Sequence, residues 1–139
     1  MAKIKIAVAG CLGRMGRELS KQIINNNKLE FVGGFEHKKH KDINRQFKIV
    51  SDINSTQLID SNPTSSIKIA QVLIDFTTPQ STLENVKIAS QNKTAVIIGT
   101  TGMTESQKKK VKSYAKKIPI LMSSNMSLGV NLLFNLVQQ

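Results

Sequence analysis

The sequence predicts an α/β fold, with a doubly wound, mainly parallel sheet and helices on both of its faces. Two observations predict it. Short apolar segments alternate with amphipathic patterns along most of the 139 residues, which is typical of βαβ units. The first apolar segment also runs directly into a glycine-rich turn, VAGCLGRMGRE at 8–18. We expect one domain over 1–127, followed by the segment 128–139.

The first part of the chain predicts a strand, a helix and a second strand. KIKIAVAG at 3–10 becomes continuously small and apolar, as a central strand covered on both faces does. Met15, Leu19 and Ile23 then recur every four residues and predict the inner stripe of a helix that begins at Arg14. Asparagines at 25–27 end this helix, and EFVGGFE at 30–36 is the second strand.

The middle third carries weaker signals. Residues 37–46 are polar and basic, and residues 51–68 contain few apolar positions. FKIV at 47–50 predicts a short strand between them. The clear pattern resumes at AQVLIDF, 70–76, a further buried strand.

Two capped helices and two strands complete the pattern. Thr78 as N-cap and Pro79 at the first position begin a helix whose inner face would carry Leu83, Val86 and Ser90. After the strand TAVIIGT at 94–100, Thr104 and Gln107 form a capping box. The lysine-rich helix that begins there would turn Val111, Tyr114 and Ile118 inward. A strand at 119–124 and an apolar helix over 128–139 follow it.

Composition limits the classes of partner. The hydrophobic fraction of 40% is ordinary for a globular domain. No stretch approaches the roughly 18 consecutive apolar residues of a membrane span, and the N-terminus lacks a secretory signal. A single cysteine, Cys11, permits no internal disulfide. We therefore expect a cytoplasmic protein without a membrane partner.

The formal net charge of +11 raises the question of a nucleic-acid partner. The lysines are scattered except in KKKVKSYAKK at 108–117, which carries one aromatic residue and no nucleic-acid-binding motif. A solvated helix face explains this group better. His37 and His40 lie in a lysine-rich stretch without the ligand set of a zinc site. We expect neither a nucleic-acid partner nor a metal site.

The glycine turn predicts a phosphate-binding site of the Rossmann type. A strand-to-helix turn directs backbone N–H groups and the positive end of the helix dipole at the space above the strand, where a pyrophosphate fits. Gly10, Gly13 and Gly16 form G-x-x-G-x-x-G, with Leu12 where the usual fingerprint has its second glycine. The alternative is a structural turn without a ligand.

An acidic residue lies where a dinucleotide site requires one. Glu36 ends the second strand, 20 residues after Gly16, at the distance typical of the carboxylate that binds the adenosine ribose. The basic stretch HKKHK at 37–41 follows it. Cationic groups there would accept the 2′-phosphate of NADP, so NADH, NADPH or both are candidates. The alternatives are an exposed glutamate and a solvated basic loop.

Three further segments follow predicted strands, where ligands of open α/β sheets bind. They are DFTTP at 75–79, GTTG at 99–102 and SSNMS at 123–127. Their small and hydroxylated residues offer backbone groups and O–H donors to a cofactor. Thr78 and Thr104 are already explained as helix caps.

Taken together, these motifs resemble the dihydrodipicolinate reductase family. GxxGRMG, the acid that ends the second strand, DFTxP, GTTG and SNxSxGVN occur in this order and at these separations. The resemblance implies an NAD(P)H-dependent oxidoreductase of the diaminopimelate route to lysine. Such an enzyme reduces a cyclic dicarboxylate imine or its hydrated precursor and is typically a homotetramer.

The resemblance also implies which residues bind NADH or NADPH. The glycine turn would hold the pyrophosphate, the acidic residue the adenosine ribose, and the ends of the last two strands the nicotinamide side. These residues are Gly10, Cys11, Leu12, Gly13, Arg14, Met15, Glu36, His37, Gly99, Thr100, Thr101, Ser123, Ser124, Asn125 and Met126. The chain departs from the family at His37 and Thr78, where arginine is frequent, and at Met126, where phenylalanine is frequent.

In the family a second domain follows, and its histidine-rich segment and lysine supply the proton donor and the contacts to the dicarboxylate substrate. This sequence stops at Gln139, within the helix that would lead there. No catalytic residue is therefore expected in it, and it should bind dinucleotide without turnover. The apolar helix 128–138 would favour self-association. A non-enzymatic Rossmann-like binding module or sensor is the alternative function.

Overall fold

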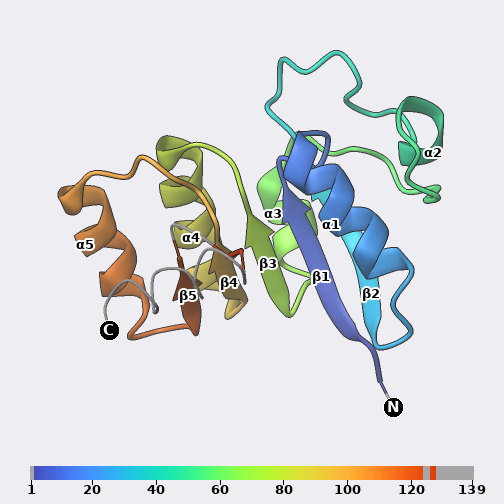
Figure 1. The fold of residues 1–139 in the computed structure, drawn as a ribbon. Coiled ribbons are helices and arrows are strands. Elements are labelled where there is room, and N and C mark those ends of the chain that lie inside the picture. Colours follow the sequence, from blue (N-terminus) through green and yellow to red (C-terminus); the bar gives the residue numbers. More distant parts are fainter. Residues whose placement is uncertain (1, 124–125, 128–139) are drawn as a thin grey trace.

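The computed structural model describes residues 2–123, 126 and 127, and they form a five-stranded parallel sheet with helices on both faces (Figure 1). The strand order is β2-β1-β3-β4-β5, with every neighbouring pair parallel. This confirms the predicted fold class. The strands are β1 (Ile4–Ala9), β2 (Leu29–Phe35), β3 (Val72–Asp75), β4 (Ala95–Ile98) and β5 (Ile120–Met122). The helices are α1 (Arg14–Ile24), α2 (Phe47–Val50), α3 (Pro63–Ile67), α4 (Pro79–Asn92) and α5 (Glu105–Tyr114).

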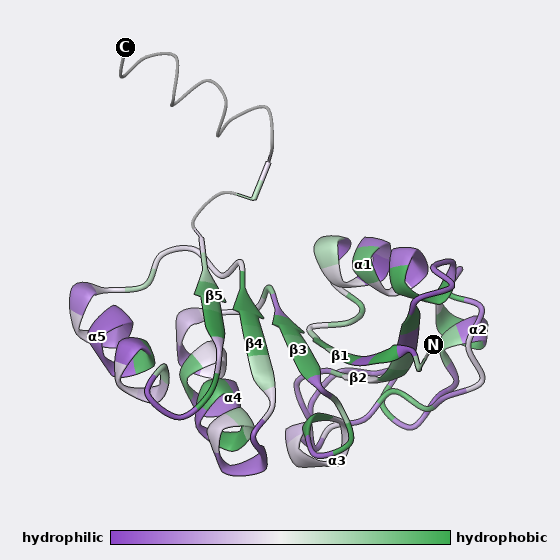
Figure 2. Ribbon diagram, turned by 90° about the horizontal axis from the view of Figure 1, so that it is seen from below, coloured by the Kyte–Doolittle hydropathy of each residue, from purple (hydrophilic) through white to green (hydrophobic). Residues whose placement is uncertain are grey.

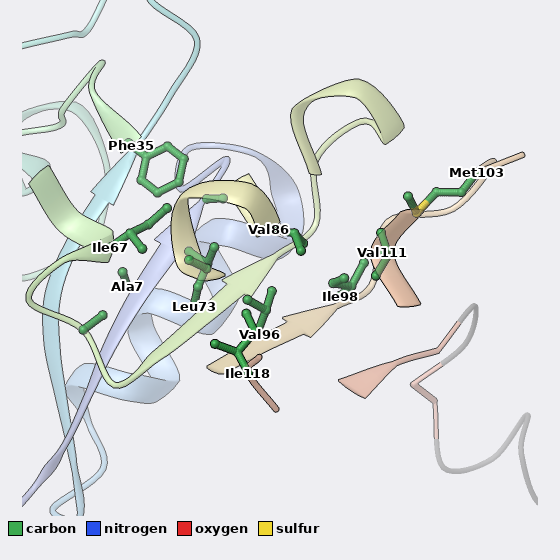
Figure 3. Close-up of a cluster of buried hydrophobic side chains, with 13 residues drawn as sticks. Ala7, Phe35, Ile67, Leu73, Val86, Val96, Ile98, Met103, Val111 and Ile118 are labelled. Atoms are coloured by element: carbon green, nitrogen blue, oxygen red, sulfur yellow. The ribbon is translucent and has the colours of Figure 1, made fainter. Parts of the chain in front are cut away.

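Helices α3, α4 and α5 cover one face of the sheet. Ala7, Leu73 and Val96 from three strands meet Ile67 of α3 and Val86 of α4 in a buried cluster (Figure 3). The same cluster includes the side chains at 111 and 118, and Tyr114 packs against it, as the sequence predicted. Alternation along each strand makes this face apolar, because successive side chains point to opposite faces.

Helix α1 lies on the opposite face, as Figure 2 shows. A second buried cluster joins this face to α1 and to the segment around α2. Val8, Ile74, Ile97 and Leu121 are paired in register across four strands. Their exposure rises along this row, from 1% at Val8 and 9% at Ile74 to 60% at Leu121. The described helices therefore cover this face over β1 and β3 and leave it open at β5.

The predicted caps are confirmed, but two predicted helix faces are wrong in part. Thr78 caps α4, and Thr104 with Gln107 forms the capping box of α5. In α1 the buried residues are Gly16, Ser20 and Ile23, whereas Met15 is 48% exposed. The contact face is rotated because a glycine and a small hydroxyl side chain allow closer packing, and Ser20 Oγ donates to the Gly16 carbonyl at 2.8 Å.

The inner face of α4 is likewise polar in part. Its buried residues are Thr82, Asn85, Val86 and Ala89, while Leu83 is half-buried at the edge of the cluster. The predicted Ser90 is not among them. Hydrogen bonds to neighbouring buried groups allow the threonine and asparagine to face inward.

The predicted strand at 47–50 is wrong, because these residues form the short helix α2. Phe47 is fully buried and packs edge-to-face on Phe31 with ring centroids 5.3 Å apart, whereas Ile49 is 61% exposed. The Ser51 N–H donates to the Phe47 carbonyl at 2.9 Å, so the segment closes its own hydrogen bonds. Four apolar residues do not distinguish a short strand from a short helix.

Helix α3 was not predicted, although its signal is present. Asn62 accepts from the Thr64 N–H at 3.0 Å, and Pro63 occupies the first position, the same pattern that begins α4. None of the helices in the described part of the chain is long and apolar enough to cross a membrane. The helix expected over 128–139 lies outside the described residues.

Candidate functional site

The strand order places a cleft beside the carboxyl end of β1. The chain leaves β1 toward β2 on one side, and β3 pairs with β1 on the other. Ligands of open α/β sheets bind at such a switch point. A cleft of about 850 Å³ opens here between the glycine turn, the end of β2 and the start of α4. Its lining residues include Gly10, Leu12, Gly13, Glu36, His37, Phe76, Thr77 and Asn85.

The glycine turn packs too closely for side chains. A Cβ at Gly16 would lie 2.0 Å from the Gly10 carbonyl oxygen and 2.8 Å from the Cys11 Cα, both of them backbone atoms. Gly10 has a φ of +65°, and a Cβ there would lie 2.9 Å from the Thr77 side chain. These glycines bring α1 against the end of β1 and keep the floor of the cleft open.

The backbone N–H groups of residues 10–13, which precede α1, all donate hydrogen bonds within the protein. The Gly10 and Cys11 N–H groups donate to the Phe35 carbonyl at 2.9 and 3.4 Å, and the Gly13 N–H donates to the Gly10 carbonyl at 3.0 Å. An α-helix provides no acceptor for the N–H groups of its first turn, here those of Arg14, Met15 and Gly16.

Nothing in the turn itself neutralises this end of α1. The N-cap, Gly13, has no side chain to accept a hydrogen bond, and the first turn carries no acidic residue. The helix dipole adds positive potential at the same place. The N–H groups that remain available to an anion are therefore those at the start of α1 rather than those of the preceding glycines.

Glu36 is held against this turn by a hydrogen bond. Its Oε1 accepts from the Leu12 N–H at 2.7 Å, and its own N–H donates to the Asp60 carbonyl at 2.9 Å. Its second carboxylate oxygen has no hydrogen-bond partner among the described residues. The predicted acidic residue thus lies on the cleft wall, with one oxygen fixed by the turn.

Basic groups continue the wall beyond Glu36. His37, Lys38 and His40 line the cleft, and the first two are exposed. His40 Nδ1 accepts from the Asp42 N–H at 3.2 Å, and the buried Asp42 pairs with Arg45 at 2.7 Å. Within the part of the chain that the structure describes, no group of three His, Cys, Asp or Glu residues could hold a metal ion.

Cys11, predicted as a cofactor-binding residue, is not among the residues that line the cleft. Its side chain is fully buried and packs on Gly34, where a Cβ would lie 2.6 Å from the Cys11 Cβ. Burial raises the pKa of the thiol well above its usual range, and the negative charge of Glu36 raises it further. The thiol is therefore a protonated core group.

The buried carboxylate of Asp75, at the end of β3, was not predicted as a functional residue. Asp75 is fully buried, and its Oδ1 accepts from the Thr77 hydroxyl at 2.6 Å and the Thr77 N–H at 3.0 Å. Its Oδ2 accepts from Asn85 Nδ2 at 2.9 Å. Thr82 and Thr100 join the same cluster. The aspartate that directly precedes two threonines, after an apolar strand, was the available signal.

Among the residues predicted for the nicotinamide side, the described ones follow β4 and β5 and are not among those that line the cleft; they are Gly99, Thr100, Thr101, Ser123 and Met126. Thr101 and Met126 are exposed, while Thr100 is 6% exposed and directs its hydroxyl into the Asp75 cluster. The ring of Phe76 lies over Gly99, where a Cβ would approach it to 2.1 Å. Ser123 follows β5, and its N–H donates to the Ile98 carbonyl at 3.2 Å. Ser124 and Asn125 lie outside the described residues.

The family model and the curated relatives agree on one family. The family model described as dihydrodipicolinate reductase, N-terminus, matches residues 4–126. A 4-hydroxy-tetrahydrodipicolinate reductase of Pelagibacter ubique is 41% identical over 138 residues, which are 99% of this chain and 50% of that protein. One from Buchnera aphidicola is 38% identical, over 99% of this chain and 51% of its own length. The chain thus spans about half the length of these relatives.

Solved structures show the same fold. Dipicolinate-bound dihydrodipicolinate reductase from Paenisporosarcina sp. TG-14 superposes with a TM-score of 0.76 at 27% identity, over 96% of this chain and 52% of that one. Apo scyllo-inositol dehydrogenase from Lactobacillus casei superposes with a TM-score of 0.71 at 12% identity, over 99% of this chain and 42% of that one. The latter likeness concerns the Rossmann-like fold alone.

Proposed function

Since the chain belongs to the dihydrodipicolinate reductase family, we propose that it forms the NAD(P)H-binding half of a 4-hydroxy-tetrahydrodipicolinate reductase. The intact protein would reduce a cyclic dicarboxylate imine, or its hydrated precursor, in the diaminopimelate route to lysine. We place this activity in the cytoplasm and in a homotetramer.

The observation that carries the proposal is the hydrogen bond between Glu36 Oε1 and the Leu12 N–H. It fixes a carboxylate, suited to ribose hydroxyls, against a turn suited to a pyrophosphate. The groups fit a dinucleotide because a Cβ at Gly10 or Gly16 would crowd the turn, and because the cleft of about 850 Å³ has the size of a cofactor site. The N–H groups of Arg14 and Met15 would bind the pyrophosphate.

The other end of the dinucleotide would lie at the carboxyl ends of β4 and β5. We assign the nicotinamide side to Gly99 and Thr101 and to the segment 123–126. When bound, the reduced nicotinamide supplies the hydride for the imine carbon. This chain would bind and orient the dinucleotide, while the proton donor and the contacts to the dicarboxylate would belong to the other half of the protein.

We propose that both NADH and NADPH bind. Glu36 favours the free ribose hydroxyls of NADH, whereas His37 and Lys38 on the same wall would offset the charge of the 2′-phosphate of NADPH.

Titration of the full-length protein with NADH and NADPH tests the proposal, with Glu36→Gln as the variant. Loss of a charged hydrogen-bond acceptor for the ribose should weaken NADH binding by about tenfold or more. The affinity for NADPH should fall less, because its 2′-phosphate takes the place of one of the ribose hydroxyls that would donate a hydrogen bond to the carboxylate. Isothermal titration calorimetry measures both affinities.

Glu30→Gln is the matched control, because Glu30 is an exposed glutamate at the opposite end of the same strand, β2. It should leave both affinities unchanged. Absence of dinucleotide binding to the folded wild-type protein, or an unchanged affinity of Glu36→Gln, would contradict the proposal. Binding without reductase activity in the full-length protein would instead indicate a binding module.

A further inference from the structure

Asp75 joins three segments of the chain in one buried cluster. Besides Thr77 and Asn85, its carboxylate lies 3.2 Å from the Thr82 hydroxyl and 3.4 Å from the Thr100 hydroxyl. Asp75 ends β3, and Thr82 lies in α4. Thr100 lies in the loop 99–102, which follows β4. The cluster therefore connects the loop that follows β3 with the loop that follows β4, at the carboxyl edge of the sheet.

The distances give the hydrogen bonds an order. Thr82 Oγ1 and Thr100 Oγ1 are 2.8 Å apart, so one donates to the other. Each hydroxyl has one proton. Because Thr82 lies closer to Asp75 than Thr100 does, the favoured chain runs from Thr100 to Thr82 to Asp75. Thr100 Oγ1 then accepts from the Thr77 N–H at 3.1 Å.

The loop 99–102 is thus attached twice to the same residue. The Gly99 N–H donates to the Asp75 backbone carbonyl at 2.9 Å. The Thr100 side chain reaches the Asp75 carboxylate through Thr82. On the other side of the cluster, Thr77 and Asn85 line the cleft. Asp75 itself has no exposed surface and can act only through these neighbours.

We propose that Asp75 is a positioning residue that latches the loop 99–102 to the end of β3 and thereby fixes the nicotinamide end of the cofactor site. This inference rests on the proposed function. It also reassigns Thr100, whose hydroxyl serves the latch and not the ligand. The latch is effective because hydrogen bonds in a buried cluster are strong and an unpaired partner there is costly.

The test compares NADH with ADP-ribose, which lacks the nicotinamide, in the full-length protein. Thr100→Val removes the hydroxyl and keeps the shape of the side chain. It should weaken NADH binding by about fivefold to tenfold, the scale of one net hydrogen bond, and change the ADP-ribose affinity by less than about twofold. Thr100→Ser restores a hydroxyl and should bind NADH within about twofold of the wild type.

Thr94→Val is the matched control. Thr94 is 1% exposed and precedes the same strand, β4, and its hydroxyl donates to the carbonyls of Ile67 and Ala70 at 3.0 and 3.3 Å. It should lower the thermal stability as Thr100→Val does and leave both ligand affinities unchanged. Asp75→Asn, if it folds, should repeat the selective loss of NADH affinity.

The outcomes separate the two proposals. Equal losses for both ligands in Thr100→Val, no loss for either, or no recovery in Thr100→Ser would overturn the latch while leaving the proposed function intact. A folded wild-type protein that binds neither NADH nor ADP-ribose would overturn both.

Discussion

Single atoms decide the geometry at the residue scale, and Gly16 is the clearest case. The space that its Cβ would need is filled by the Gly10 carbonyl and the Cys11 Cα, and neither can rotate away as a side chain could. The positions of the glycines were visible in the sequence. Only the folded structure shows what a side chain at each glycine would meet. A Cβ at Gly16 would meet backbone atoms, whereas a Cβ at Gly99 would meet the ring of Phe76.

Gly16→Ala should destabilise the protein although alanine favours helices. Overpacking costs about 1–3 kcal/mol, and the upper end applies here because the Cβ would meet backbone atoms that cannot rotate away. The roughly 1 kcal/mol that alanine gains over glycine inside a helix then offsets only part of the cost. We expect a net loss of about 2 kcal/mol in the free energy of unfolding, measured by urea denaturation. Gln22→Ala, at an exposed position of the same helix, should stay within about 0.5 kcal/mol of the wild type. A Gly16→Ala protein as stable as wild type would show that α1 does not pack as described.

Helix boundaries at the element scale follow from local signals, whereas helix faces do not. The caps at Thr78 and Thr104 were predicted because a hydroxyl that accepts from a backbone N–H two or three positions later is a contact within a few residues. The inner faces of α1 and α4 were predicted less well. Ser20 and Thr82 are buried through hydrogen bonds to partners that a hydropathy pattern does not reveal.

Thr104→Ala should measure the contribution of the capping box to α5. The Thr104 hydroxyl accepts from the Gln107 N–H at 3.2 Å, and Gln107 Oε1 accepts from the Thr104 N–H at 2.9 Å. Loss of an N-cap of this kind costs about 1 kcal/mol of unfolding free energy. Ser106→Ala, exposed in the same first turn, should change it by less than about 0.5 kcal/mol. Equal effects of the two substitutions in chemical denaturation would exclude the capping contribution.

The segment between β2 and α3 is integrated only at the scale of the whole molecule. Its apolar residues Phe47, Ile53 and Ile59 are fully buried, although they are widely spaced in a polar sequence. An ion pair between Lys21 of α1 and Asp52 holds the segment against α1. The hydrogen bond from Lys21 lowers the pKa of the Asp52 carboxyl below its usual range.

This ion pair predicts a pH dependence. Because the folded pKa of Asp52 is lowered, its contribution to stability is present above the ordinary pKa of about 4 and is lost as the pH falls through the folded value. Asp52→Asn should therefore differ from the wild type in urea midpoint between about pH 5 and 7, and the difference should vanish at lower pH. It should be small and decrease with salt, since the pair is exposed to solvent. Glu30→Gln removes an exposed carboxylate that has no ion pair among the described residues, and it should not reproduce this pattern. A difference between Asp52→Asn and the wild type that grows on acidification would contradict the prediction.

The sequence by itself determined the parallel α/β fold, the glycine turn, the acid at the end of β2 and the family. Each of these depends on the order and spacing of residues along the chain. Only the tertiary structure decided the short helix at 47–50, the burial of Cys11 and the inward direction of the Thr100 hydroxyl. These depend on partners more than 15 residues away, such as Phe31 for Phe47 and Asp75 for Thr100. Such partners meet only when the strands assemble into the sheet, and packing and hydrogen bonding at that stage decide whether a side chain faces a ligand or the core.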